Sequence, residues 1–533
     1  MKKLIYGLLI AVFLLSACNQ GSTQTQDPGN TSTPEQTLPE PAVQTTSLPD
    51  VSEIVTDFLE KWKASDFSGM YAMLAPTSKD AINEEDFSKA YANLANNLTL
   101  KDITFGIVTS LVNPTSAKVG YKVHYTTSLF GELDRQMEAN LVVDGGTWKI
   151  QWEDGMMLPE LSGGKKLALQ VSSPNRGDIY DREGNIIATE TEAVALGVVP
   201  DQITESSSQA LVDQLNVMTG LPKNMIIDRY RGKSGEFYVP MGEVSGQGYY
   251  ERANKLSSIA GLVVNPYTDR YYYNGGIAPQ VIGYLLSISP ENYDEYRRQG
   301  YAGDERIGAS GIEEWGEEYL RGTPSAELYV VNPDGTYDNR LGSVDSQAPE
   351  NIYTTIDKKL QLGVQKALYG FTGAIVVMER DTGKVLAMAS SPDFDPNSFQ
   401  TSNYNSQYVL GDLVNDPNTP LWNRAAQSAY PLGSVFKLVT ASAALESGLY
   451  TPDTTYECTS QFTELPGYIG NDWTYDKDLP PSGTLTLVQG IMRSCNPWFY
   501  HIGLDLYRQK GASYLADMAR SFGLGEPTGI EGI

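Results

Sequence analysis

The sequence has 533 residues, of which 41% are hydrophobic and 20% are charged, a composition typical of globular domains. This length exceeds what one hydrophobic core can organise, so roughly three or four domains are expected. The 65 acidic residues outnumber the 39 basic ones, and the formal net charge of −26 argues against a nucleic-acid partner, because phosphate binding requires a basic surface.

The chain begins with a segment typical of exported proteins. Residues 1–18, MKKLIYGLLIAVFLLSAC, carry two lysines, then an apolar stretch, then small residues before Cys18. The apolar stretch is shorter than the roughly 20 residues of a spanning helix, which favours a cleaved signal peptide. Residues 15–18 resemble the lipobox of bacterial lipoproteins, in which the cysteine carries the lipid. We therefore expect a lipid anchor on Cys18 at the extracytoplasmic face of the cell membrane; the alternative is a plain signal peptide.

Residues 19–50 are polar and rich in Thr, Gln and Pro, which predicts a disordered tether. If Cys18 is lipidated, Cys458 and Cys495 remain, and they can pair in an oxidising compartment. His124 and His501 have no cysteine or carboxylate cluster beside them, so we expect structural roles for both. The sequence therefore predicts no metal site, no Ser-His-Asp triad and no cofactor.

Residues 51–155 predict a small α+β domain. Asp50 and Glu53 are placed as a capping pair for a helix. Apolar side chains then recur at helical spacing: Val51, Ile54, Val55, Phe58, Leu59 and Trp62. Residues 140–152, NLVVDGGTWKIQW, alternate after an Asp-Gly-Gly turn, which is typical of a β-hairpin. No residue cluster here indicates catalysis, so we interpret the domain as a spacer or scaffold.

Residues 156–350 are rich in turns and chemically undistinguished. Asp181, Gly184 and Asn185 mark a turn between two extended pieces. Further along, four acidic residues are expected to form a solvated helix face: Glu313, Glu314, Glu317 and Glu318. Nothing in the sequence places one of these carboxyl groups in an apolar pocket, so a hydrolase with paired carboxylates is not indicated.

Residues 351–533 predict an α/β arrangement. A short strand is followed by Asp357, placed as the cap of an amphipathic helix. Residues 373–392, GAIVVMERDTGKVLAMASSP, indicate two apolar strands joined by a turn at Asp381–Gly383. A strand pair combined with this helix and with later helices is typical of layered α/β domains.

The first candidate for chemistry lies in residues 429–449, AYPLGSVFKLVTASAALESGL. The stretch is apolar on every side, which predicts a buried helix that ends near Gly448. Ser434 falls at its N-terminus, and Lys437 falls one turn later on the same face. Burial lowers the pKa of a lysine, and a neutral amine beside a serine hydroxyl can activate it as a nucleophile, while the helix N-terminus favours an oxyanion. The alternative is an ordinary serine cap with a solvent-facing lysine.

A second polar element favours a catalytic role for Ser434 and Lys437. Residues 484–506, TLTLVQGIMRSCNPWFYHIGLDL, are apolar and helical in pattern but contain Ser494-Cys495-Asn496. Such an element offers one hydroxyl that can pass protons and one amide that can bind a carbonyl. Ser-x-x-Lys followed by an element of the Ser-Asp-Asn type is the pattern of penicillin-binding proteins and the related β-lactamases.

The sequence resembles the class B penicillin-binding proteins, the peptidoglycan transpeptidases of bacterial cell-wall synthesis. Residues 176–188, RGDIYDREGNIIA, resemble the signature that opens the family's non-catalytic domain, and residues 308–322, GASGIEEWGEEYLRG, resemble its second signature. Residues 423–437, NRAAQSAYPLGSVFK, resemble the segment that enters the nucleophile helix.

The resemblance implies a multidomain α+β protein. Residues 51–155 are similar to the NTF2-like N-terminal domain of the methicillin-resistance type. Residues 156–350 would form the dimerisation-type domain, and residues 351–533 the serine transpeptidase domain, which is related in fold to β-lactamases.

The resemblance also implies roles for the candidate residues. Ser434 would attack the penultimate D-Ala carbonyl of a stem peptide that ends in D-Ala-D-Ala, with Lys437 as its base, and its backbone N–H would supply half of an oxyanion hole. Ser494 would relay a proton towards the leaving D-alanine, and Asn496 would hold the substrate amide. β-Lactams would acylate the same serine, and the partners would include a glycosyltransferase and proteins of division or elongation.

Three departures from the family pattern are visible. Leu432 stands where the family usually has a proline, and Gln280 stands where it usually has a histidine. No Lys-Thr-Gly or Lys-Ser-Gly follows Asn496, although that motif binds the substrate carboxylate and completes the oxyanion hole in the family. The resemblance therefore implies an incomplete transpeptidase domain, inactive as it stands, in which strands 374–378 and 385–389 lack further sheet partners.

Other functions remain open at this point. A serine β-lactamase shares Ser-x-x-Lys and would be separated by rapid hydrolysis of the acyl-enzyme. A non-enzymatic β-lactam receptor relays through spanning helices, and no stretch after residue 16 is long and apolar enough for one. A cell-wall scaffold that only binds partners would keep its cellular role after Ser434→Ala.

Overall fold

The structure is a computed structural model and describes residues 48–235 and 237–532. The chain divides into a unit of residues 1–49 and a compact unit of residues 50–533. The predicted signal peptide, Cys18 and most of the predicted tether lie outside the described residues. Within the part of the chain that the structure describes, no helix has both the length and the apolar character needed to cross a membrane.

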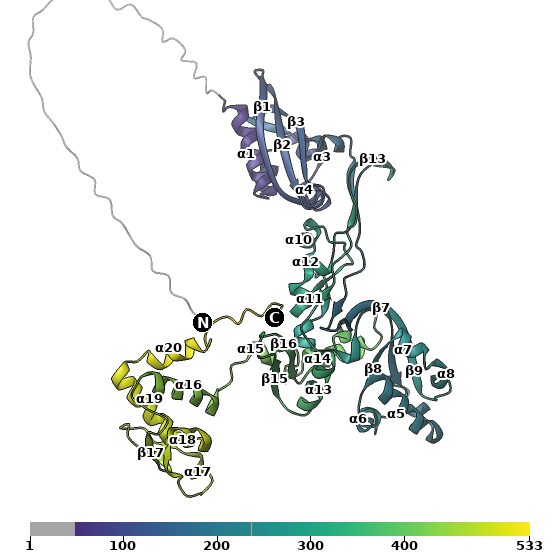
Figure 1. Cartoon of the computed structure of the whole chain (residues 1–533). Helices are drawn as coiled ribbons and strands as arrows, with labels where there is room; N and C mark the ends of the chain where they lie inside the picture. Colours follow the sequence, from purple (N-terminus) through teal and green to yellow (C-terminus); the bar gives the residue numbers. More distant parts are fainter. Residues whose placement is uncertain (1–47, 236, 533) are drawn as a thin grey trace, which may run out of the picture. The chain divides into compact units, whose positions relative to one another are not determined.

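The first folded segment consists of helices followed by an antiparallel sheet (Figure 1). The helices are α1 (Val51–Lys63), α2 (Phe67–Ala72), α3 (Pro76–Ala81) and α4 (Glu84–Leu98), and the strands, in sheet order, are β1 (Leu100–Val112), β2 (Ser116–Thr127), β3 (Glu132–Asp144) and β4 (Thr147–Gln151). Asp50 caps α1 by accepting a hydrogen bond from the backbone N–H of Ser52 at 2.8 Å. The predicted hairpin is β3–β4, whose turn residues Gly145 and Gly146 both have positive φ, as its tight turn requires. The predicted α+β arrangement is confirmed.

The apolar face predicted for α1 forms the core between the helices and the sheet. Phe58, Leu59 and Trp62 are all buried. The ring of Trp62 meets the rings of Tyr91 and Tyr125 edge to face, at centroid distances of 5.2 and 6.0 Å. Aromatic pairs in this geometry add to the free energy gained by burying their area, so they fix how the helices pack on the sheet.

Residues 166–353 contain two larger sheets and a strand pair. The three-stranded sheet has the order β13 (Tyr337–Val344), β12 (Ser325–Val331), β5 (Lys166–Ser172). The five-stranded sheet has the order β14 (Ile352–Tyr353), β6 (Ile179–Tyr180), β7 (Ile186–Val198), β8 (Val239–Ser245), with β9 (Leu262–Tyr272) also paired to β7. The strand pair is β10 (Leu285–Ser287) with β11 (Arg306–Gly308). The helices are α5 (Glu205–Thr219), α6 (Lys223–Tyr230), α7 (Gly246–Tyr250), α8 (Ala253–Leu256), α9 (Pro279–Ile282), α10 (Tyr293–Arg298), α11 (Gly311–Trp315) and α12 (Glu317–Leu320).

The turn predicted between β6 and β7 is present and is organised by Asp181. One carboxylate oxygen of Asp181 accepts hydrogen bonds from the backbone N–H groups of Glu183 and Asn185, and the other accepts from the side-chain amide of Asn185. Gly184 has φ of 84°, a conformation that residues with a side chain rarely adopt. Asp181 is buried, so these bonds replace the water that its carboxylate loses.

The expectation of a solvated acidic face at residues 313–318 is wrong for Glu313. Its side chain is fully buried, and its two carboxylate oxygens accept from Nε of Arg176 at 2.7 Å and from Nε of Arg270 at 2.8 Å. Burial alone would raise the pKa of Glu313, but the charges of Arg270 and Arg176 outweigh it and lower that pKa. Glu317 is partly buried and also pairs with Arg176, whereas Glu314 and Glu318 are exposed as expected.

The third segment opens with helix α13 (Lys358–Leu368), capped by Asp357 as predicted. Strands β15 (Gly373–Met378) and β16 (Val385–Ser391) pair with one another, and within the described residues no third strand joins them. Three short helical elements follow: η5 (Pro396–Phe399), α14 (Ser406–Val414) and α15 (Arg424–Gln427). Leu368 and Val364 of α13 pack on Ala387 and Ala389 of β16, so one face of this strand pair is covered.

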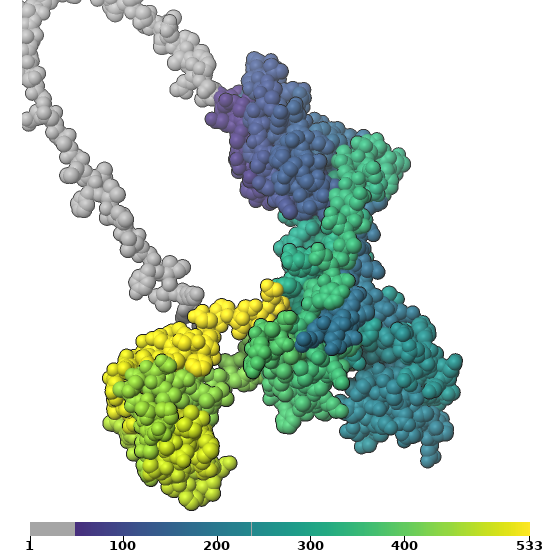
Figure 2. Space-filling view, in the orientation of Figure 1, coloured from purple at the N-terminus to yellow at the C-terminus, as the bar shows by residue number. Residues whose placement is uncertain are grey.

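The remaining elements form a segment centred on helix α19 (Asn496–Lys510). The other helical elements are η6 (Gly433–Val435), α16 (Phe436–Glu446), α17 (Trp473–Asp476), α18 (Leu487–Arg493) and α20 (Tyr514–Ser521). Two strand pairs complete the segment: β17 (Thr455–Cys458) pairs with β20 (Gly483–Thr486), and β18 (Gln461–Phe462) pairs with β19 (Gly470–Asn471). Figure 2 shows this segment, coloured yellow-green to yellow, packed as one body. Trp498 of α19 is fully buried in its core beside Ala443, Ala444 and Leu487.

Candidate serine active site

Ser434 lies in the single 3₁₀ turn η6, directly before helix α16. The prediction placed it at the helix N-terminus, and the structure places it in the turn that leads into the helix. Gly433 has φ of 57°, so the turn needs a residue that tolerates a left-handed backbone. Lys437 is the second residue of α16, one turn beyond Ser434.

The structure brings the four predicted side chains together. The hydroxyl of Ser494 donates to Oγ of Ser434 at 2.8 Å. The amine of Lys437 donates to Oγ of Ser494 at 3.0 Å, to the backbone oxygen of Ser494 at 2.7 Å and to Oδ1 of Asn496 at 2.6 Å. These bonds form a continuous chain from the first motif to the second across 60 residues of sequence.

Lys437 reaches Ser434 through Ser494. Among the hydrogen bonds of the described residues, none joins Lys437 to Ser434 directly, and all three donors of the ammonium group are used on Ser494 and Asn496. Lys437 is half-buried, and burial lowers its pKa from the ordinary value of 10.5, against the opposing charge of Asp472. A lowered pKa increases the fraction of neutral amine, which is the form that can accept a proton.

Sequence comparison assigns the chain to a family. Residues 373–532 match the penicillin binding protein transpeptidase domain, residues 171–354 match the penicillin-binding protein dimerisation domain, and residues 51–165 match the NTF2-like N-terminal transpeptidase domain. The chain belongs to the penicillin-binding protein family. The family predicted from the sequence signatures is therefore confirmed.

Two curated relatives and one solved structure show how far the similarity extends. The peptidoglycan D,D-transpeptidase MrdA of Escherichia coli K12 is 32% identical over 380 residues, which cover 69% of this chain and 58% of the relative. Penicillin-binding protein 3 of Bacillus subtilis is 24% identical over 494 residues, covering 89% of this chain and 70% of the relative. A complex of a penicillin-binding protein with MreC from Helicobacter pylori matches at 24% identity and a TM-score of 0.47, covering 68% of this chain and 67% of that one. The chain thus spans little more than half the length of the E. coli relative.

Helix α16 of this penicillin-binding protein and the η6 turn before it are more open than predicted. Val435, Leu438 and Leu445 are exposed, at 70%, 53% and 41% of their full accessible surface, and Ser434 is exposed as well. Only the face that carries Val439, Ala443 and Ala444 is buried, because α16 packs against α19 and α20 on that side. The site is therefore open to solvent at Ser434 and half-buried at Lys437.

The two smaller departures from the family pattern have different surroundings. Leu432 is half exposed and precedes the η6 turn. Gln280 is buried, and its amide donates to the backbone oxygens of Pro420 at 2.8 Å and Pro392 at 3.4 Å. A Lys-Ser-Gly tripeptide does occur at residues 233–235, but it precedes the serine motif and lies outside the strands, between α6 and β8.

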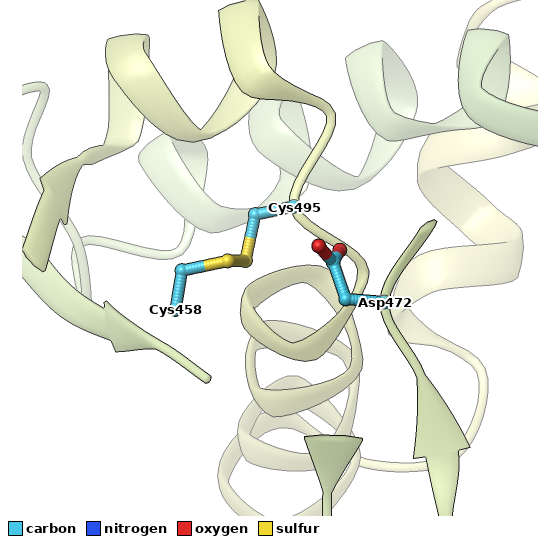
Figure 3. A group of neighbouring side chains, drawn as sticks. All are labelled: Cys458, Asp472 and Cys495. Carbon is cyan, nitrogen blue, oxygen red and sulfur yellow. A yellow bond between two sulfur atoms is a disulfide. The ribbon is translucent and has the colours of Figure 1, made fainter. Parts of the chain in front are cut away.

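Three neighbouring side chains that the sequence did not single out as a site gather at the second motif. Cys495, the middle residue of that motif, forms a disulfide with Cys458, and Asp472 lies beside it (Figure 3). Both sulfur atoms are used in the disulfide, so the cluster offers no thiolate to a metal ion. The pairing had been left open from the sequence, and Asp472 had no signal beyond the Asp-x-Thr pattern of an ordinary helix cap.

The histidines take no part in this serine site within the described residues. His124 pairs with Glu132 and Asp134 on the first sheet, and His501 of α19 pairs with Glu464. Both interactions join side chains at the surface of their own segment, as expected for structural histidines.

Proposed function

We propose that this chain is a peptidoglycan D,D-transpeptidase that acts through an acyl-enzyme on Ser434. The observation that carries the proposal is the unbroken chain of hydrogen bonds from Ser434 through Ser494 to Lys437 and Asn496, within residues that match a transpeptidase domain. The substrate follows from the family resemblance and is a stem peptide that ends in D-Ala-D-Ala.

The partners of Lys437 determine the path of the proton. A neutral amine has one lone pair, and it can accept a hydrogen bond only from a group that carries a donor. The backbone oxygen of Ser494 and Oδ1 of Asn496 are acceptors only. The hydroxyl of Ser494, which accepts from the ammonium form of Lys437, is therefore the one of these three groups that can donate to the neutral amine. Ser494 therefore relays the proton of Ser434 to Lys437.

Acylation and cross-linking then follow this proton path. Oγ of Ser434 attacks the penultimate D-Ala carbonyl while its proton passes to Ser494 and the proton of Ser494 passes to Lys437. The carbon–nitrogen bond breaks, and the protonated Lys437 returns a proton through Ser494 to the departing D-alanine amine. The amine of a second stem peptide attacks the ester, which forms the cross-link and restores the hydroxyl of Ser434.

The test is covalent labelling with a fluorescent penicillin, followed by peptide mass mapping. Because the Lys-Thr/Ser-Gly motif of the family does not follow Asn496 in these 533 residues, we expect no adduct on the chain as it stands, and the labelling is repeated on the chain extended through any coding sequence that continues in frame. We expect an adduct on Ser434 of the extended chain that persists for many turnover times, and none in its Ser434→Ala variant.

Each alternative function has its own outcome in this experiment. Rapid loss of the adduct with release of hydrolysed penicillin would identify a β-lactamase. A folded, extended chain that is never labelled would overturn the serine mechanism and leave a scaffold role.

We also propose that a lipid on Cys18 anchors the mature chain at the extracytoplasmic face of the cell membrane, where peptidoglycan is assembled with a glycosyltransferase and with division or elongation proteins. The motif at residues 15–18 supports the anchor. A Cys18→Ala variant is expected to lose the lipid, measured by metabolic labelling with a fatty acid and by membrane fractionation. An equal amount of labelled lipid on this variant would contradict the anchor site.

A further inference from the structure

A short segment at the start of α17, residues 471–473, contacts the chain on both sides of Cys495. The backbone N–H of Asn496 donates to Oδ1 of Asp472 at 2.8 Å, and the side-chain amide of Asn496 donates to the backbone oxygen of Asn471 at 3.0 Å. The indole N–H of Trp473 donates to the backbone oxygen of Arg493 at 2.9 Å. With its amide nitrogen committed to Asn471, Asn496 presents Oδ1 to Lys437.

Asp472 itself is fixed and unusual. Its side chain is fully buried, its second carboxylate oxygen accepts from the hydroxyl of Thr474 at 2.7 Å, and no ion pair with it is found among the described residues. Its carboxylate lies at the first backbone N–H of α19, a helix of 15 residues whose N-terminus carries partial positive charge. Burying a charge without an ionic partner is unfavourable, so the hydrogen bonds from Asn496 and Thr474 and the N-terminus of α19 are what hold this carboxylate in place.

We propose that Asp472 is a positioning residue of the serine site, and that its carboxylate fixes the start of α19 and thereby turns Asn496 towards Lys437. This role rests on the proposed function, since Asn496 and Lys437 act on the substrate only if the site is a transpeptidase. Asp472 touches neither Ser434 nor the expected substrate position and acts through Asn496.

The charge of Asp472 also acts on Lys437. The groups around the Lys437 amine are Ser494 and Asn496, the ring of Phe499 on α19 at 5.5 Å, and the charge of Asp472. The cations of the neighbouring elements, Arg493 and Lys477, contact the ring of Trp473 instead. Since a nearby carboxylate favours the ammonium form, its removal should leave Lys437 neutral at a lower pH.

The first test needs no enzymatic activity. Acetic anhydride is applied over a range of pH, and acetylation of Lys437 is quantified by peptide mass spectrometry relative to Lys358, a half-buried lysine of α13 that is distant in sequence. In the Asp472→Asn variant, we expect the reactivity profile of Lys437 to move to lower pH while that of Lys358 stays in place. Asp478→Asn is the matched control, because Asp478 is exposed and its φ of 51° suits asparagine. An unchanged Lys437 profile in Asp472→Asn would overturn the action of the Asp472 charge on Lys437, and the second test decides on the positioning of Asn496.

The second test separates hydrogen bonding from charge by the rate of penicillin acylation. Asp472→Ala removes the acceptor for Asn496 and is expected to slow acylation by up to about 100-fold, as misplaced catalytic groups do. Asp472→Asn keeps an acceptor oxygen and is expected to recover most of that rate above the pKa of Lys437. Acylation of Asp472→Ala at the unmodified rate would overturn the proposal. If Asp472→Ala does not fold, the acylation rate and the lysine profile of Asp472→Asn decide whether Asp472 acts on the site. If even the unmodified chain is never acylated, the proposed function fails, and the lysine profile still shows whether Asp472 acts on Lys437.

Discussion

Glu313→Ala is expected to lower the free energy of unfolding of this penicillin-binding protein by about 3–5 kcal/mol, the usual cost of removing one partner from a buried ion pair. The substitution leaves the guanidinium groups of Arg176 and Arg270 inside the protein, where each is bonded to Glu313 through Nε. Arg176 is 6% exposed and Arg270 is fully buried, so water does not replace the lost carboxylate. The hydroxyl of Tyr272 also loses its acceptor.

The Arg176–Glu313–Arg270 triad also predicts a pH dependence of stability. The pKa of Glu313 is lower in the folded chain than its ordinary value of 4.5, so the folded state favours the carboxylate. The stabilisation from the carboxylate is complete above about pH 4.5 and is lost as the pH falls through the lowered pKa of the folded state. We expect the Glu313→Gln variant to be less stable than the unmodified chain at pH 7 and the difference to shrink as the pH falls below 4.

The measurement is urea unfolding of Glu313→Ala, monitored by circular dichroism, with Glu314→Ala as the control. Glu314 is the next residue of α11 and is exposed, so its loss should change stability by no more than about 0.5 kcal/mol. Because a multidomain chain does not unfold in a single two-state step, the relevant transition is the one that moves in Glu313→Ala and stays in Glu314→Ala. Equal unfolding midpoints for the two variants would show that the triad contributes nothing.

Lys437→Met is expected to slow acylation of Ser434 by penicillin by about 10²- to 10⁴-fold, the range for losing a general base. Methionine keeps an unbranched side chain of similar length but has no group that can accept the proton from Ser494. Lys437→Arg should be equally slow, because a guanidinium stays protonated and cannot act as a base although it can donate hydrogen bonds. A Lys437→Arg variant that retains the full acylation rate would show that Lys437 serves only as a hydrogen-bond donor and not as the base.

The pH dependence of acylation follows from the same residue. Burial lowers the pKa of Lys437, and the neutral amine exists above that pKa, so the rate should rise with pH through a midpoint below 10.5. Stopped-flow absorbance with a chromogenic β-lactam, on the chain that the labelling experiment shows to be acylated, measures this midpoint. Lys477→Met is the control, since Lys477 is exposed beside Trp473 and should leave both rate and midpoint unchanged.

The sequence predicted those elements that are determined by residues close together in the chain. The period of α1 follows from residues within one helix, and the β3–β4 hairpin follows from a turn that needs two residues with positive φ. The Ser-x-x-Lys spacing likewise places Ser434 and Lys437 one turn apart without knowledge of the remaining chain. Their meeting with Ser494 and Asn496 required the family pattern, because no local rule joins residues 60 positions apart.

Glu313 shows why the remaining features escaped prediction. Its segment, GIEEWGEEYL, has the charge pattern of an exposed helix, and its partners Arg176 and Arg270 lie 137 and 43 residues away. The same limit applies to Asp472, whose pattern fits a helix cap and whose contact with Asn496 spans 24 residues. Helix α16 was predicted to be buried on every side, and one of its faces is exposed. Apolar content alone does not reveal that this face has no neighbour among the described residues.

The disulfide has a consequence for when the second motif matures. Cys495 separates Ser494 from Asn496, and its bond to Cys458 ties that motif covalently to the end of β17. Thiols stay reduced in the cytosol and are oxidised after export. Since we propose that the chain is exported, newly made chains inside the cell are expected to carry this loop without its covalent tie, and protein produced in a reducing cytoplasm is expected to differ from the exported form at the centre of its second motif.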